Sequence, residues 1–320
     1  MTMTWNGVMP AITTPFTPDG DIDHAFLAAH ARWMLDAGCT GIVALGSLGE
    51  AATLSAGEKL DVLRTLARAL DGRVPRAPLV AGIAALSTDE ACGLAREAAA
   101  IGCSGLMVLP PYVYSTDWRE MRAHVAAVID ATALPCMLYN NPIAYRTDFR
   151  PEHVAELARS HANLVAVKES SADVRRVAAI RHALGDRLEI LVGVDDLIVE
   201  GIAAGATGWV AGLVNAMPAE SVRLFDLATR AFARDGANAQ DRARARVRAD
   251  DLYRWFVPLL TLDTVPKFVQ LIKLVQQQVG HGHERVRAPR LVLEGAEREA
   301  TLALIAQKLE TRPRLDANDA

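Results

Sequence analysis

One lysine of this chain occupies a position where an amine can carry out covalent chemistry. Lys168 follows Leu164–Val167, an apolar run that predicts a strand buried on both faces. The other lysines fall in helical patterns with many polar neighbours: Lys59, Lys267, Lys273 and Lys308. Lys168 either pairs with a buried carboxylate such as Glu169 or Asp195, or attacks a carbonyl to form a Schiff base. Desolvation at the strand end can lower a lysine pKa, as a nucleophile requires, but the local sequence alone leaves both interpretations open.

A phenol and a hydroxyl accompany this amine in the sequence. Tyr139 ends the preceding apolar run, so adjacent strands can bring it to Lys168, where a phenol relays protons during imine formation. The alternative is a core tyrosine whose hydroxyl is already hydrogen-bonded. Ser47 follows an earlier strand, but Leu45 breaks the G-x-S-x-G pattern of a hydrolytic serine. These residues therefore indicate amine chemistry rather than hydrolysis.

The elements that must position these side chains alternate between apolar runs and segments of helical period. The runs predict eight strands: Val8–Thr14, Gly41–Leu45, Leu79–Ile83, Gly105–Leu109, Cys136–Tyr139, Leu164–Val167, Glu189–Val192 and Gly208–Ala211. Eight strand–helix repeats indicate an α/β fold, a (β/α)8 TIM barrel. A doubly wound nucleotide-binding sheet is disfavoured because neither G-x-G-x-x-G nor G-x-x-x-x-G-K-[ST] occurs.

The chain is expected to divide into a barrel and a helical extension. Residues 1–217 are predicted to form the barrel, and residues 218–320 a C-terminal helical region packed on it. The carboxyl ends of barrel strands, where active sites lie, carry no cluster of histidines and carboxylates that predicts a metal site. His281–Glu284, the dense histidine group, is interpreted as a surface loop.

Composition limits the classes of partner. The net charge of −4 and pI near 6.1 argue against nucleic acid and anionic membranes as partners. No apolar run has the length of a membrane span, and Met1–Gly7 lacks the pattern of a signal peptide. The cysteines are scattered without a C-x-x-C pair, which is typical of reduced thiols. We therefore predict a soluble cytoplasmic protein that binds a small molecule.

Three motifs together resemble one known family. Tyr139–Pro142 (Y-N-N-P), Val167–Ser170 (V-K-E-S) and the G-x-x-G-E pattern of Gly46–Glu50 are similar to the dihydrodipicolinate synthase/N-acetylneuraminate lyase family. The likeness runs from about Val8 to the end of the chain. It implies a class I aldolase barrel with a helical C-terminal portion, no cofactor or metal, and assembly as a homotetramer, a dimer of dimers.

The resemblance also implies roles for individual residues. Lys168 would form the Schiff base, Tyr139 would relay protons, and Ser47 would bridge the relay and hold the substrate carboxylate. Tyr112 would insert into the site of a neighbouring subunit. Further substrate contacts are expected at Leu48, Gly49, Gly193, Val194, Val210 and Gly212.

One departure from the family bears on the substrate. Dihydrodipicolinate synthases carry an arginine two residues after the proline of the tyrosine motif, where it holds the carboxylate of an aldehyde substrate. That position is Ala144 here, and the nearest arginine is Arg146. Loss of a charge-assisted carboxylate contact costs about 1.5–3 kcal/mol. The segments 139–146, 193–196 and 252–256 are more similar to Δ1-pyrroline-4-hydroxy-2-carboxylate deaminase and L-2-keto-3-deoxyarabonate dehydratase.

We therefore predict a Schiff-base lyase that dehydrates or deaminates a small 2-oxo acid, or its cyclic imine, to 2-oxoglutarate semialdehyde. The alternative is 4-hydroxy-tetrahydrodipicolinate synthase or another pyruvate-dependent aldolase. A third possibility is a non-catalytic binding protein on an enzyme scaffold. The intact set of Lys168, Tyr139 and Ser47 argues against it.

Overall fold

Eight parallel strands form the centre of the molecule in a computed structural model that describes residues 3–73, 76–114, 116–233 and 238–315. They are β1 (Gly7–Pro10), β2 (Ile42–Ala44), β3 (Leu79–Ile83), β4 (Gly105–Val108), β5 (Cys136–Asn140), β6 (Leu164–Glu169), β7 (Glu189–Val192) and β8 (Gly208–Ala211). The pairing order is β1-β8-β7-β6-β5-β4-β3-β2. A parallel bridge between Ala11 and Val43 closes the ring. The predicted (β/α)8 barrel is confirmed.

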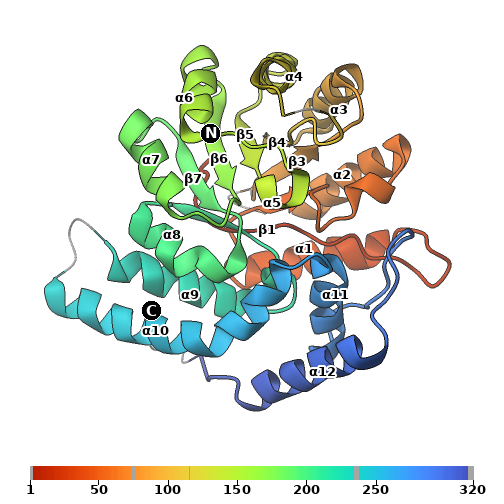
Figure 1. Cartoon of the computed structure of the whole chain (residues 1–320). Helices are drawn as coiled ribbons and strands as arrows, with labels where there is room; N and C mark the ends of the chain where they lie inside the picture. Colours follow the sequence, from red (N-terminus) through yellow and green to blue (C-terminus); the bar gives the residue numbers. More distant parts are fainter. Residues whose placement is uncertain (1–2, 74–75, 115, 234–237, 316–320) are drawn as a thin grey trace.

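Helices surround this barrel on the outside, except the short α5 (Pro142–Tyr145), which lies over the carboxyl ends of the strands (Figure 1). Those between the strands are α1 (His24–Asp36), α2 (Ala56–Leu70), α3 (Thr88–Ile101), α4 (Trp118–Asp130), α5, α6 (Pro151–Ser160), α7 (Arg175–Leu184) and α8 (Ile198–Ala204). Four follow β8: α9 (Pro218–Ala231), α10 (Ala239–Leu260), α11 (Phe268–Gln278) and α12 (Gly295–Glu310). Helix α9 contacts α8 and β1, and α10 contacts α9 and α12. The predicted boundary between residues 217 and 218 stays a prediction.

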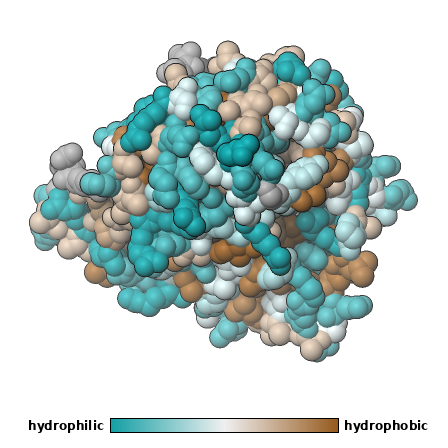
Figure 2. Space-filling view, turned by 45° about the horizontal axis from the view of Figure 1, so that its top comes forward, coloured by the Kyte–Doolittle hydropathy of each residue, from teal (hydrophilic) through white to brown (hydrophobic). Residues whose placement is uncertain are grey.

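The core lies inside the barrel and between its strands and helices. Every residue of β2 to β5 and of β8 is buried, as expected for a parallel sheet covered on both faces. All four cysteines are buried and free, and burial raises the pKa of Cys39, Cys103 and Cys136 to about 12. Hydrophilic and hydrophobic side chains are interspersed on the face that Figure 2 shows. Within the described ranges, no helix is both long and apolar enough to cross a membrane.

The histidine group His281–Glu284 is not the plain surface loop that the sequence suggested. The His281 ring stacks on Trp33 of α1, with ring centroids 3.7 Å apart, and only His283 of this group is exposed. The aromatic faces of α1 cover His281, a contact that local sequence does not reveal.

Beside this stack lies His30 of α1, which is fully buried. Its Nε2 is 3.2 Å from Asn215 Oδ1 and 3.3 Å from Gln276 Nε2. Desolvation lowers the pKa of His30 to about 3. The imidazole is therefore neutral in the folded chain between about pH 3 and pH 6.5, a range in which the unfolded chain would protonate it.

This buried histidine makes folding stability depend on pH. The unfolded chain binds a proton at His30 below about pH 6.5 and the folded chain does not, so stability falls as the pH drops. We expect the His30 contribution to lower the free energy of unfolding by about 2 kcal/mol between pH 7 and pH 5. Urea unfolding of wild type and His30→Gln at both pH values measures it. His283→Gln, at an exposed site, should keep the wild-type pH dependence, and an unchanged dependence in His30→Gln would contradict the assignment.

Candidate active site

A pocket of about 790 Å³ opens at the carboxyl ends of the barrel strands. The predicted site residues that line it are Lys168, Tyr139, Ser47, Tyr112, Leu48, Gly193, Val194, Val210 and Gly212. The remaining one, Gly49, does not line the pocket. Its carbonyl oxygen instead accepts a hydrogen bond from Thr14 Oγ1 at 2.6 Å. The barrel thus brings residues from most of the chain to one cavity.

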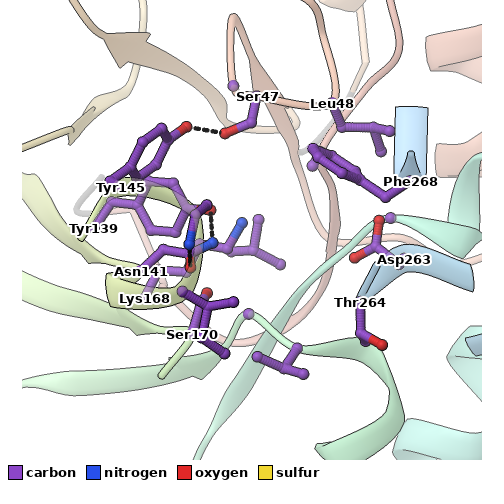
Figure 3. A pocket seen from close by; sticks show the side chains of 18 of the residues that line it. Ser47, Leu48, Tyr139, Asn141, Tyr145, Lys168, Ser170, Asp263, Thr264 and Phe268 are labelled. Carbon is purple, nitrogen blue, oxygen red and sulfur yellow. Dashed lines mark hydrogen bonds between the residues drawn. The ribbon is translucent and has the colours of Figure 1, made fainter. Parts of the chain in front are cut away.

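Lys168 and Tyr139 are direct neighbours in this pocket. They are partners in the register of β6 and β5, and Lys168 Nζ lies 4.4 Å from the centroid of the Tyr139 ring. The lysine is 6% exposed. Among the described residues, no hydrogen bond or salt bridge engages its Nζ atom. The amine therefore faces the cavity without an ionic partner (Figure 3).

The carboxylates that could have neutralised this amine are bonded elsewhere. Glu169 accepts hydrogen bonds from Asn140 Nδ2 at 3.0 Å and from the Ser171 amide at 2.7 Å. Asp195 accepts bonds from Trp209 Nε1 and from the backbone amides of Gly212 and Leu213. Burial raises the pKa of Asp195 to about 6, and these donors and the charge of Lys168 oppose the rise. Lys168 therefore acts on Asp195 through its charge but forms no salt bridge with Glu169 or Asp195.

Gly193, directly after β7, leaves space for the Lys168 side chain because it has no Cβ atom. A Cβ atom built on Gly193 would lie 2.5 Å from Lys168 Cε, which is shorter than real Cβ contacts. The same atom would also collide with Ser170 Oγ. The absence of a side chain at Gly193 therefore lets Lys168 run along the strand end into the pocket.

Tyr145 is a site residue that the sequence did not identify. It ends the one-turn helix α5, which begins at Pro142, and the Asn141 side chain caps that helix by accepting a hydrogen bond from the Ala144 amide at 3.0 Å. The Tyr145 hydroxyl is hydrogen-bonded to Ser47 Oγ. Burial raises the pKa of Tyr145. Proline after a capping asparagine was the available signal for this helix.

Tyr145 packs against two other tyrosines. Its ring meets Tyr139 edge to face with centroids 5.9 Å apart, and the Tyr112 ring centroid lies 5.2 Å from it. Asn141 Nδ2 donates to the Tyr139 hydroxyl at 3.0 Å. Tyr112 lines the pocket of its own chain, so its predicted insertion into a neighbouring subunit stays a prediction. The hydrogen bonds thus join Tyr145 to Ser47 and Asn141 to Tyr139, whereas the three tyrosines meet one another through ring contacts.

The C-terminal region supplies the opposite wall. Asp263 and Thr264 lie across the pocket from Tyr139, and Phe268 of α11 lies near Leu48 (Figure 3). Arg290 lines the pocket as well. The sequence assigned this region only to packing, because helical periodicity does not show which helix end reaches a distant cavity. Arg146 is exposed and does not line the pocket.

Comparisons with known proteins identify the family to which the chain belongs. The sequence model of the dihydrodipicolinate synthetase family matches residues 4–308. The chain belongs to this family. It is 36% identical over 308 residues to a protein of Xanthomonas axonopodis pv. citri named 4-hydroxy-tetrahydrodipicolinate synthase, covering 96% of each chain. A protein of that name from Natronomonas pharaonis is 36% identical over 226 residues, covering 70% of this chain and 75% of the relative.

Two solved structures of dihydrodipicolinate synthetase relatives have the same fold over almost the whole chain. The 4-hydroxy-tetrahydrodipicolinate synthase of Methylacidiphilum fumariolicum SolV gives a TM-score of 0.85 at 27% identity, covering 96% of this chain and 98% of the other. YagE of E. coli K12, described as a prophage protein of the dihydrodipicolinic acid synthase family in complex with pyruvate, gives 0.83 at 26% identity, covering 95% and 99%.

The close approach at Gly193 predicts the effect of a single methyl group. Gly193→Ala should displace Lys168 from the cavity and abolish its labelling by pyruvate and borohydride. Gly93→Ala is the matched control, because a Cβ at Gly93 meets no atom within 4 Å. Mass spectrometry of the reduced protein measures the labelling. Wild-type labelling of Gly193→Ala would contradict the proposed packing.

Proposed function

We propose that this chain is a lysine Schiff-base lyase that acts on a small 2-oxo acid. The observation that carries the proposal is the Lys168 amine, free of ionic partners and 4.4 Å above the Tyr139 ring in the pocket. A desolvated amine beside a proton-relaying phenol is the arrangement that covalent catalysis on a carbonyl needs. The pyruvate in the YagE structure supports a 2-oxo acid as the ligand class.

The reaction begins with the substrate carboxylate held by donors around Ser47 and Leu48. Neutral Lys168 attacks C2, and Tyr139 passes protons as the carbinolamine loses water. The Tyr145–Ser47 hydrogen bond places a second phenol in reach of this exchange. The iminium then acidifies C3, because it accepts the electron pair that the C3 proton leaves behind.

Two reactions can follow from that enamine. In the first, C3 attacks an aldehyde, as in 4-hydroxy-tetrahydrodipicolinate synthesis; the names of the 36%-identical relatives support this reaction, which the sequence had placed second. In the second, the C4 hydroxyl leaves and 2-oxoglutarate semialdehyde forms. Its support is the exposed position of Arg146, away from the pocket. Condensation has the broader support, and we take it as the leading assignment.

Borohydride reduction in the presence of pyruvate tests the nucleophile. We expect irreversible labelling at Lys168, found by peptide mapping, and no labelling in Lys168→Ala. Lys59→Arg, on α2 and outside the pocket lining, should be labelled like wild type. Labelling at another lysine would overturn the assignment. Consumption of pyruvate together with an aldehyde acid identifies condensation, and semialdehyde release from a 4-hydroxylated 2-oxo acid or its cyclic imine identifies elimination.

The tyrosines can be ranked by their contacts with Ser47. Tyr145→Phe removes the hydroxyl that binds Ser47, so we expect kcat to fall about 100-fold, as for loss of a proton-transfer group. Tyr112→Phe keeps that bond and should lower kcat less. Steady-state rates of the two variants measure the difference. Equal losses would contradict this ranking, and a larger loss in Tyr112→Phe would assign the role of the second phenol to Tyr112.

The homotetramer and the cytoplasmic location inferred from the sequence stay predictions. Analytical ultracentrifugation of the purified chain addresses the first.

A further inference from the structure

A carboxyl group that the mechanism above does not use faces the pocket. Asp263 ends the short 3-10 turn η4 (Thr261–Asp263), which follows α10. Its side chain lines the cavity on the wall opposite Tyr139 (Figure 3). It packs so tightly against Gly212 at the end of β8 that a Cβ there would lie 2.8 Å from Asp263 Oδ2 and closer still to Oδ1.

Asp263 differs from its neighbour Asp195 in its hydrogen bonds. Asp195 receives donors from Trp209 Nε1 at 2.9 Å, from the Leu213 amide at 2.7 Å and from the Gly212 amide at 3.1 Å. In the described part of the chain, no donor and no cation is bonded to the Asp263 carboxyl group. Of these two residues, only Asp195 accepts the hydrogen bonds that stabilise a carboxylate.

The charges around Asp263 act in the same direction. Desolvation raises its pKa well above the ordinary value, the nearby Asp195 and Asp196 raise it further, and Lys168 opposes them. Two carboxyl groups close together do not both ionise easily, and the one with more donors keeps the negative charge. The lack of donors and the neighbouring charges thus both favour the protonated form at Asp263 over that at Asp195.

We propose that Asp263 is a catalytic acid that protonates the substrate oxygen at C4. This assignment rests on the proposed Schiff-base function and adds a proton donor on the wall opposite Lys168. Both candidate reactions place an oxygen at C4: condensation turns an aldehyde carbonyl into a hydroxyl there, and elimination removes a hydroxyl from the same carbon. A single acid near C4 can therefore donate the proton that either reaction requires.

The proton and electron balance is the same in outline for both reactions. In condensation, the enamine electron pair forms the C3–C4 bond, the carbonyl pair moves to oxygen, and that oxygen takes the Asp263 proton. In elimination, the pair from the C3–H bond forms the C3–C4 double bond, and the C4–O pair leaves as water with the Asp263 proton. The carboxylate recovers its proton from solvent water before the next turnover.

The test separates formation of the enamine from chemistry at C4. Asp263→Asn keeps a neutral polar group of similar shape but cannot transfer a proton. We expect exchange of the pyruvate methyl protons in D₂O, followed by NMR, to stay within about twofold of wild type, and turnover to fall at least about 100-fold. Asp263→Glu should recover part of the turnover, because it restores the acid.

Each other outcome has a distinct meaning. Asp251→Asn, on the exposed face of α10, controls for loss of one carboxyl group and should match wild type. Parallel loss of exchange and turnover in Asp263→Asn, or unchanged turnover, would overturn the acid role. The acid role would also be overturned if wild-type chain is labelled at Lys168 but converts neither the aldehyde of the condensation nor the 4-hydroxylated substrate of the elimination. Wild-type chain without labelling or exchange would instead refute the proposed function itself.

Discussion

The mouth of the barrel depends on one buried ion pair between Lys273 of α11 and Glu50. Their side chains are 2% and 0% exposed, and Lys273 Nζ also donates to the carbonyl oxygens of Thr14 and Arg285 at 2.8 Å. Two charges removed from water are stable only when further hydrogen bonds complete their coordination, and the Arg287 amide supplies one to Glu50 at 3.1 Å. This pair fixes the loop that carries Ser47 and joins it to the C-terminal helices.

The sequence revealed the strand ends of the site but not the ion pair between Lys273 and Glu50. Strand periodicity located β5 and β6, and because their ends lie in register, the proximity of Lys168 and Tyr139 could be inferred from spacing alone. Lys273 looked like an ordinary helical lysine, since its partner is 223 residues away. Because this pairing could not be predicted, the sequence did not show that the C-terminal region, with Asp263, forms one wall of the pocket.

Tyr145 shows a second limit of sequence reasoning. A helix of four residues is too short to show periodicity, so its one useful side chain looked like part of a loop. Its neighbours Ala144 and Arg146 bear on the arginine that the family pattern expects, whereas no family motif points to Tyr145. The barrel strands can therefore be predicted from their repeating pattern, whereas the short segments that shape the pocket are identified only from the structure.

Gly193 and Gly212 end adjacent strands, and each is packed against a functional side chain rather than against solvent. At these two positions the cavity wall leaves no room for a side chain, because an added Cβ would collide with Lys168 or with Asp263. Ligand preference on this scaffold can consequently change only at other lining positions, such as those of α5 and of the turn after α10.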